Sequence, residues 1–219
     1  MVDGKLKKRF LEITVLLMIL LLLQILGAFD GINRQIEMFF PSGDFFVGIL
    51  TETASSTAVA IYLFVFFVHD ILEIRKLSRF SINLAVGLAV SMLIVGALKV
   101  LFAQPRPGEA QVHWSLLESL KNVDYFAFPS GHTARAAVFA YFLSRRWKKL
   151  WPLWWGWALA IATSRLLLHV HWFGDVIFSL VLGPWAGMLV ELTESRWLAY
   201  YRLVVGKLKL GVLDVEQST

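Results

Sequence analysis

Three cationic side chains and two histidines stand in this sequence at positions where they could perform phosphate chemistry. Lys99, Arg106 and Arg165 together match the charge and the hydrogen-bonding geometry of a phosphate group. His132 and His171 would supply a nucleophile or base together with an acid. If the fold brings these five side chains together, the sequence predicts a site that binds a phosphate and transfers it.

Two short motifs support the same chemistry. Ser130 precedes Gly131 and His132 at the start of an apolar segment, where it can cap a helix whose free backbone N–H groups attract an anion. Asp175 follows His171 by four residues. If that turn is helical, the two side chains share a face, and the carboxylate can hold the imidazole in one tautomer and support its positive charge.

The same residues argue against a metal centre. Few carboxylates accompany the histidines, and cations fill the place where a metal would neutralise phosphate charge. The chain contains no Cys, which excludes disulfides, thiolate metal sites and a Cys nucleophile. The sequence therefore predicts neither a metal nor a cofactor.

The segments that must position these residues are strongly apolar. The chain is 58% hydrophobic and 17% charged, whereas a soluble domain carries about 25% charged residues. A membrane span needs about 20 mostly apolar residues, and the hydropathy predicts six spans: Leu11–Phe29, Ser55–Ile71, Phe80–Phe102, Ser130–Ser144, Leu150–Val170 and Asp175–Leu192. Residues 30–50 read as a short interfacial helix, a turn and the approach to the second span.

The predicted fold is therefore all-α: a polytopic membrane bundle with six transmembrane helices. Residues 1–219 form a single domain, with the chemical motifs inside residues 99–175 and a frayed tail over residues 206–219. No solvated basic face is present, so a nucleic-acid partner is not expected.

Charge placement predicts how this bundle is oriented. Of the 21 Lys and Arg residues, fifteen fall on the side of the two termini, and three, Arg34, Arg106 and Lys121, fall on the opposite side. Positive residues accumulate on the cytoplasmic side of membrane proteins, so both termini are expected in the cytoplasm. The histidines and the three cations then lie near the outer ends of their spans, which predicts a cell-membrane protein with an extracytoplasmic site.

The complete pattern resembles a known family. The segments Lys99-x6-Arg106-Pro107, Pro129-Ser130-Gly131-His132 and Ser164-Arg165-x5-His171-x3-Asp175 resemble, in order, the three-part signature of the type 2 phosphatidic acid phosphatase family. Each part alone is a weak signal, but the three together are highly specific. The six-span pattern extends the likeness to nearly the whole chain.

This resemblance implies a helical bundle and metal-independent phosphate transfer through a phosphohistidine on a membrane lipid. It implies that His171 is the nucleophile, that Asp175 orients it, and that His132 protonates the leaving oxygen. The residues implied to hold the phosphate are Lys99, Arg106, Ser130, Gly131 and Arg165.

Arg135 is a further cation on the helical face of His132. It could pair with an acid such as Glu12 or Asp30, or it could contact a second phosphate. The stretch His132-Thr133-Ala134-Arg135 also resembles family members that act on isoprenoid diphosphates. The second reading makes a polyprenyl diphosphate the favoured substrate.

Several alternatives stay open on the sequence. The substrate could be phosphatidylglycerophosphate or phosphatidic acid, and a lipid phosphotransferase would share the same first half-reaction. Lys99 could extend to the membrane surface, and Arg165 could form a structural ion pair with Asp175. A lipid-binding or transport protein would use the cations alone, and the pair of His132 and His171 argues against that class.

Overall fold

The computed structural model describes residues 4–216 as helices joined by loops. The α-helices are α1 (Gly4–Ile25), α2 (Asp30–Phe39), α3 (Phe45–Glu52), α4 (Ser56–Ile74), α5 (Arg79–Phe102), α6 (Leu116–Lys121), α7 (Gly131–Arg146), α8 (Trp151–Leu167) and α9 (Phe173–Lys207). Short 3-10 turns occupy η1 (Val123–Tyr125), η2 (Lys148–Leu150) and η3 (Gly211–Leu213). Within these residues no strand forms beyond an isolated β-bridge, so the all-α prediction is confirmed.

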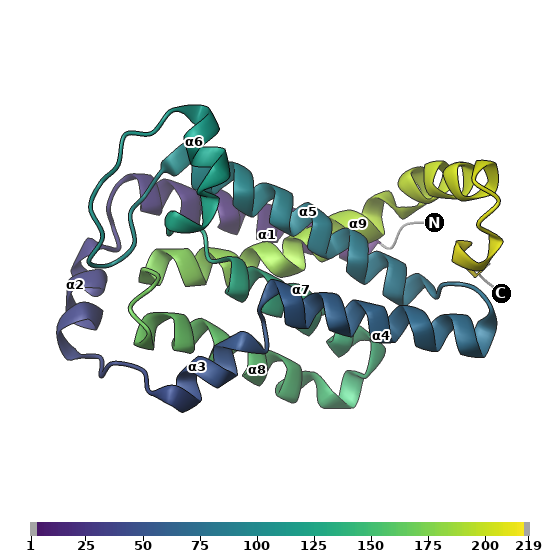
Figure 1. Ribbon diagram of the computed structural model, residues 1–219, viewed down its shortest axis with the longest axis horizontal. Helices are drawn as coiled ribbons and strands as arrows, with labels where there is room; N and C mark the ends of the chain where they lie inside the picture. The colour runs from purple at the N-terminus through teal and green to yellow at the C-terminus, as the bar shows by residue number, and fades with distance from the viewer. Residues whose placement is uncertain (1–3, 217–219) are drawn as a thin grey trace.

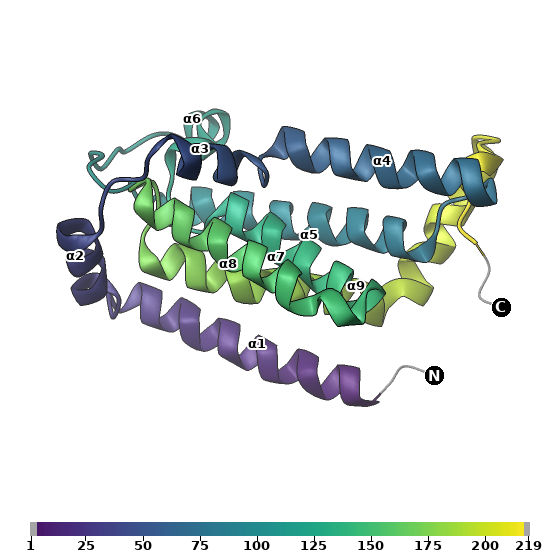
Figure 2. The ribbon, with the colours of Figure 1, turned by 90° about the horizontal axis from the view of Figure 1, so that it is seen from below.

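The long helices run side by side. Helices α1, α4, α5, α7, α8 and α9 lie along the long axis of the molecule (Figures 1 and 2). The short helices α2 and α6 lie at one end of this bundle, whereas α1 begins and α9 ends at the other (Figure 1). The loops that carry the motifs after α5 and α8 are therefore gathered at the end that holds α2 and α6.

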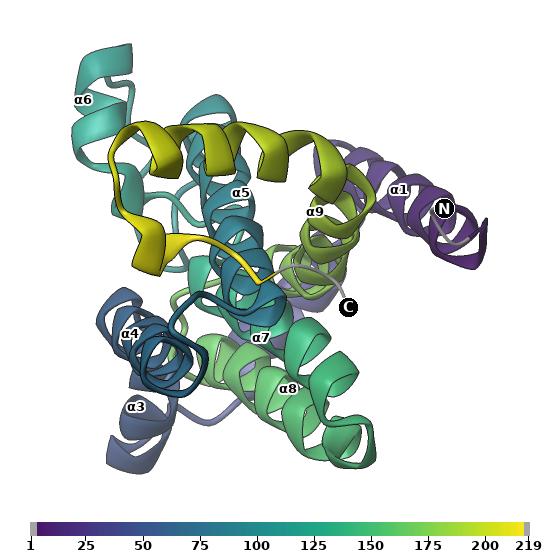
Figure 3. The ribbon, with the colours of Figure 1, turned by 90° about the vertical axis from the view of Figure 1, so that its right-hand side faces the viewer.

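Helix α7 is the centre of the bundle. All its side chains from Thr133 to Leu143 are buried, and Figure 3 shows the helix enclosed by α5, α8 and α9. Small residues permit this close packing: a Cβ added at Gly183 of α9 would collide with the Cβ of Ala137 on α7. Because neighbouring helices rather than lipid surround the buried part of α7, it needs no continuous apolar surface, which explains how it accommodates Arg135 and the hydroxyls of Thr133 and Tyr141.

Length and apolarity mark this chain as a multi-pass membrane protein. Within the described residues, α4, α5 and α9 are each long and apolar enough to cross a bilayer. Helices α1 and α2 satisfy the same test together but are bent by 75° at their junction. Helices α7 and α8 have 16 and 17 residues, which is shorter than a typical span. The count of six spans therefore stays a prediction.

The helix boundaries agree with the predicted spans within a few residues, except at the start of the first span, where α1 already begins at Gly4, and at the end of the last one. The predicted sixth span is Asp175–Leu192, but α9 continues without a break to Lys207. Its last turns cross the end of the bundle (Figure 3). Hydropathy detects where a helix leaves the bilayer, and residues such as Leu198 and Tyr201 extend the same helix by packing on the α4–α5 turn beyond that point.

The prediction of a frayed tail is wrong for residues 206–216. The backbone N–H of Leu77 donates to the carbonyl of Asp214 at 2.8 Å, and that of Glu216 donates back to Leu77 at 3.0 Å. Lys76 Nζ also contacts an Asp214 carboxylate oxygen at 3.1 Å. The chain after α9 is thus tied to the α4–α5 turn, and residues 217–219 lie outside the described part.

Candidate active site

A cavity of about 330 Å³ is lined in part by Val123 and Asp124, and α6, which precedes these residues, lies at one end of the bundle (Figure 1). Helices α4, α5, α7 and α8 form its walls together with the loops after α5 and α8. Seven of the nine site residues predicted from the sequence line it: Lys99, Arg106, Gly131, His132, Arg135, Arg165 and His171. The other two, Ser130 and Asp175, are fully buried beside it. The fold therefore brings together residues that are up to 76 positions apart in the chain.

Each of the three motif cations is held from behind by a protein acceptor. Lys99 donates to the carbonyl of Phe126, and Arg106 donates to the carbonyl of Asp124. Lys99 is only 5% exposed, so it does not extend to the membrane surface. These contacts fix the two side chains at the cavity and leave their charges free for an anion.

Arg165 reaches the cavity from the last turn of α8. One terminal nitrogen donates to the hydroxyl of Thr51 at 3.0 Å. No carboxylate lies within 4.0 Å of it in the described part of the chain, so the alternative of a structural ion pair with Asp175 is wrong. The Nε atoms of Arg165 and Arg106, and Nε2 of His132, are buried without a hydrogen-bond partner among the described residues. Buried polar groups are nearly always paired, so these nitrogens are available to an anionic ligand.

His171 lies in the turn between α8 and α9, and its side chain is 2% exposed. Its Nδ1 is 3.2 Å from a carboxylate oxygen of Asp175, and the same oxygen accepts from the backbone N–H of Trp172 at 2.8 Å. A carboxylate only accepts, so Nδ1 carries the proton and the lone pair is on Nε2. Burial and the nearby Arg165 charge lower the pKa of His171 well below its ordinary value, which keeps the ring neutral.

The predicted contact between His171 and Asp175 is confirmed, although its geometry differs from a shared helical face. His171 precedes α9, which begins at Phe173, and Asp175 lies in the first turn. The carboxylate reaches back to the imidazole across this helix start.

The start of α7 differs from the prediction in one respect. Ser130 occupies the N-cap position, but its side chain makes no capping hydrogen bond. Its hydroxyl instead accepts from the hydroxyl of Thr133 at 3.0 Å. The first N–H groups of a helix have no intrahelical partner, and Gly131 places this helix start on the cavity wall. The backbone at this point is therefore available to an anion.

Arg135 has neither of the acid partners considered from the sequence. Its Nε donates to the carbonyl of Ala54 at 2.8 Å, and a terminal nitrogen lies 3.5 Å from the sulfur of Met92. No carboxylate forms an ion pair with it among the described residues. Its guanidinium lines the same cavity as Lys99 and Arg165, which places a fourth cation there.

Sequence reasoning missed three residues that shape the site. Thr51 holds Arg165 from the α3–α4 junction. Trp172 donates from its indole nitrogen to the carbonyl of Pro105 at 2.9 Å, which fastens the His171 turn to the loop after α5. Asp124 lines the cavity as a carboxylate. None of them has a local signal, because each acts on a residue far away in sequence.

The described residues contain no group of three or more His, Cys, Asp or Glu side chains arranged to hold a metal ion. The cavity instead combines four cations with two histidines and Asp124 on its wall, with the buried Asp175 behind them. This set can bind a strongly anionic tetrahedral group and present a neutral imidazole nitrogen to it.

Comparison with known proteins gives one family match. The model of the PAP2 superfamily matches residues 80–196, which include all three sequence motifs. An undecaprenyl-diphosphatase of Sulfolobus acidocaldarius is 30% identical over 128 residues. That alignment covers 57% of this chain and 60% of the relative, so less than two thirds of the relative's length is matched.

Two solved structures share the fold. The first transmembrane PAP2-type phosphatidylglycerolphosphate phosphatase from Bacillus subtilis has a TM-score of 0.64 and 20% identity, covering 85% of this chain and 96% of that one. LpxE of Aquifex aeolicus has a TM-score of 0.52 and 23% identity, covering 75% of this chain and 92% of that one. At these identities the likeness establishes the architecture.

Proposed function

This chain belongs to the PAP2 superfamily, and on that basis we propose that it is a membrane phosphatase that removes phosphate from a lipid phosphate or diphosphate. The observation that carries this proposal is the cavity that Arg106, Arg165 and His132 line together with His171, which is paired with Asp175. Each of the first three has a buried nitrogen without a partner among the described residues. Cations alone would suffice for binding a headgroup. Phosphate transfer requires more: a neutral imidazole that is backed by a carboxylate can act as the nucleophile, and a second histidine on the cavity wall can act as the acid.

The proposed reaction has two steps. Nε2 of His171 attacks phosphorus and forms an N–P bond while the bond to the leaving oxygen breaks, and His132 gives that oxygen a proton. Water then attacks the phosphohistidine, His132 takes up a proton, and inorganic phosphate leaves with His171 restored. Asp175 holds the Nδ1 proton throughout and supports the charge that develops on the ring.

The proposed phosphate site comprises Lys99, Arg106, Arg165 and the backbone at Ser130 and Gly131. These groups lie at the cavity before any ligand binds, so they can offset charge on the transferring group without reorganisation. They supply the neutralisation that a metal ion gives in other phosphatases. The proposed reaction therefore needs neither a metal nor a cofactor.

A polyprenyl diphosphate is the proposed substrate. Arg135 adds a cation on the cavity wall and has no acid partner in the described residues, which suits the second phosphate of a diphosphate. The relative from Sulfolobus acidocaldarius is an undecaprenyl-diphosphatase, which supports the same choice. Phosphatidylglycerophosphate and phosphatidic acid remain the alternative substrates, and a phosphotransferase would replace water by another acceptor in the second step.

Substrate preference tests this proposal. With purified protein in one detergent and excess chelator, we expect kcat/KM to be highest for a polyprenyl diphosphate, lower for phosphatidic acid and phosphatidylglycerophosphate, and lowest for glucose phosphate. Arg135→Ala should lower kcat/KM for the diphosphate about tenfold more than for the monophosphates, which is the value of one charge-assisted hydrogen bond.

Each contrary outcome has a distinct meaning. A clear preference for phosphatidylglycerophosphate would assign the enzyme to phospholipid synthesis. A preference for glucose phosphate would show that the substrate is not a lipid. An equal loss on all substrates in Arg135→Ala would leave this side chain a structural role at Ala54. A requirement for added metal would refute the proposed mechanism.

We also propose that the cavity opens on the extracytoplasmic side and that both termini are cytoplasmic. The charge asymmetry of fifteen cations against three supports this orientation. The chain has no Cys, so a single introduced cysteine can report on which side of the membrane its position lies. An Ala110→Cys variant, exposed in the loop after α5, should react with a membrane-impermeant maleimide in intact cells. Lys148→Cys, exposed at the opposite end, should not react until the membrane is permeabilised, and the reverse pattern would invert the orientation.

A further inference from the structure

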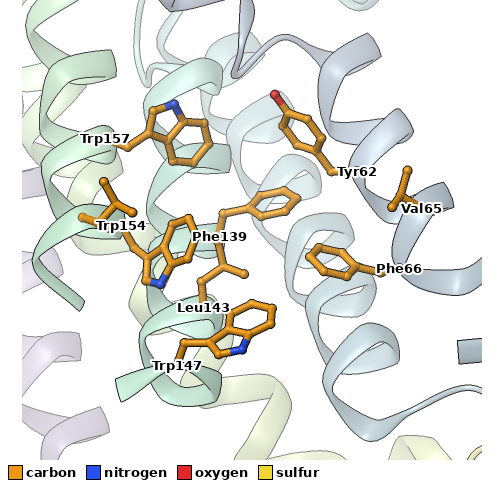
Figure 4. Close-up of a pocket in the computed structure, with 9 residues that line it drawn as sticks. Tyr62, Val65, Phe66, Phe139, Leu143, Trp147, Trp154 and Trp157 are labelled. Atoms are coloured by element: carbon orange, nitrogen blue, oxygen red, sulfur yellow. The ribbon is translucent and has the colours of Figure 1, made fainter. Parts of the chain in front are cut away.

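An apolar groove of about 470 Å³ runs along the side of the bundle between α4 and α8. Figure 4 shows its floor on α7 and its two walls on α4 and α8. The floor consists of Phe139, Leu143 and Trp147, and the α4 wall of Tyr62, Val65 and Phe66. Phe139 contacts both walls edge to face, with ring centroids 5.8 Å from Tyr62 and 6.3 Å from Trp157 of α8. Within residues 4–216, no charged side chain lines this groove.

The groove begins where the candidate active site ends. On α7, Arg135 lines the active-site cavity, and Phe139 and Leu143 follow on the same helical face at intervals of four residues. On α8, Arg165 belongs to the cavity and Trp157 to the groove. From Arg135 to Leu143 the helix rises about 12 Å, and Trp147 follows directly after the end of α7. The same three helices therefore form the walls of both spaces, one after the other along the bundle.

The α3–α4 junction marks the boundary between the two spaces. The carbonyl of Ala54 accepts from Nε of Arg135, and the hydroxyl of Thr53 accepts from the indole nitrogen of Trp157 at 2.9 Å. This junction thus contacts one residue of the cavity and one of the groove. It fixes the polar space and the apolar space relative to each other.

We propose that this groove binds the hydrocarbon chain of the lipid whose phosphate occupies the candidate active site. A lipid carries its phosphate at the membrane surface and extends its chain into the bilayer, parallel to the spans. The cavity and the groove have that same order of polarity and that same direction. The proposal rests on the phosphatase function proposed above and adds the surface that recognises the hydrocarbon chain of the substrate.

Contacts between the groove and the hydrocarbon chain of the lipid, at a distance from phosphorus, have a kinetic consequence. They can hold the phosphate in position for attack by His171, so the energy of binding the chain contributes to kcat/KM. A series of prenyl diphosphates of increasing length should therefore show rising kcat/KM until the chain fills the groove, and no further rise beyond that length.

Filling the groove tests the proposal. Val65→Trp places a large side chain into it from α4. We expect the ratio of kcat/KM for the longest prenyl diphosphate to kcat/KM for nitrophenyl phosphate to fall at least about tenfold, because even one displaced methylene changes kcat/KM by about that factor. Ala60→Trp is the matched control: Ala60 is also exposed on α4 but points about 140° away around the helix, so the ratio should not change.

A direct readout separates this proposal from the proposed function. A long-chain lipid diphosphate with a photoreactive group in its chain should crosslink to Phe139 or Leu143 in an inactive His171→Ala protein, and excess inorganic diphosphate should compete. Crosslinking that is equally strong for a neutral lipid with the same chain would show an ordinary bilayer lipid in the groove and overturn the proposal. If the wild type hydrolyses the lipid but Val65→Trp leaves the ratio of the two kcat/KM values unchanged, the groove does not bind the hydrocarbon chain, and the phosphatase function still stands. Absence of lipid hydrolysis in the wild type would overturn the phosphatase function itself.

Discussion

Replacing His171 by alanine should lower phosphate release by at least about 10⁴-fold, the scale of loss seen when a catalytic nucleophile is removed. No other buried imidazole is backed by a carboxylate in the described residues: Nδ1 of His171 lies 3.2 Å from Asp175, and Nε2 of His132 has no partner. The measurement is phosphate release from a lipid diphosphate, together with acid-labile phosphate trapped on the wild-type protein and absent from the variant.

His169 provides a matched control two residues away. It does not line the active-site cavity, and its backbone is left-handed, with φ of 50°. Asparagine tolerates that conformation, so His169→Asn should fold and retain activity. If His171→Ala keeps near wild-type activity with an unchanged Tm, the nucleophile is a different residue and the proposed phosphohistidine is wrong.

The second large effect is expected at His132, and it should depend on the leaving group. A lipid alkoxide needs a proton in order to leave, whereas nitrophenolate does not. His132→Ala should therefore slow single-turnover cleavage of a lipid monophosphate by about 10²–10⁴-fold, the usual contribution of a general acid. The burst of nitrophenolate from nitrophenyl phosphate should change by less than about tenfold.

The burst is the necessary measurement, because it reports the first step before water attacks. In the steady state, loss of His132 would also slow hydrolysis of the phosphohistidine and would reduce both substrates alike. Equal losses in the burst and in lipid cleavage would show that His132 binds the phosphate rather than protonating the leaving oxygen. Thr133→Val is a control at the adjacent position: its hydroxyl donates to Ser130 rather than lining the cavity.

These two histidines illustrate how the fold separates their environments. His171 is enclosed at the α8–α9 turn with Asp175 behind it, whereas His132 stands in the first turn of α7 with a free ring nitrogen. The Nδ1 contact holds one imidazole in a single tautomer. The other imidazole is free to exchange a proton with a ligand or with water.

The sequence by itself determined the helical membrane architecture and most of the candidate site. Runs of apolar residues report on burial, in lipid or among other helices, over one helix at a time, which is why the predicted spans match α4, α5, α7 and α8 closely. The motifs around His132 and His171 are local, and their spacing fixes which residues share one turn. The chemistry of Lys99, Arg106 and Arg165 follows from their type alone once they fall at the same end of the bundle.

Only the tertiary structure decided the partners of these residues. Arg165 meets Thr51 and Arg135 meets Ala54 across separations of 114 and 81 residues, and no periodicity encodes such contacts. The hydroxyl oxygen of Ser130 accepts from the hydroxyl of Thr133 rather than from a backbone N–H of α7, a choice between two nearby donors that the sequence does not encode. The tail packs on Leu77, although its composition resembles a free end. The groove between α4 and α8 was also invisible in sequence, because hydropathy marks a side chain as apolar without telling whether lipid, another helix or a substrate chain will cover it.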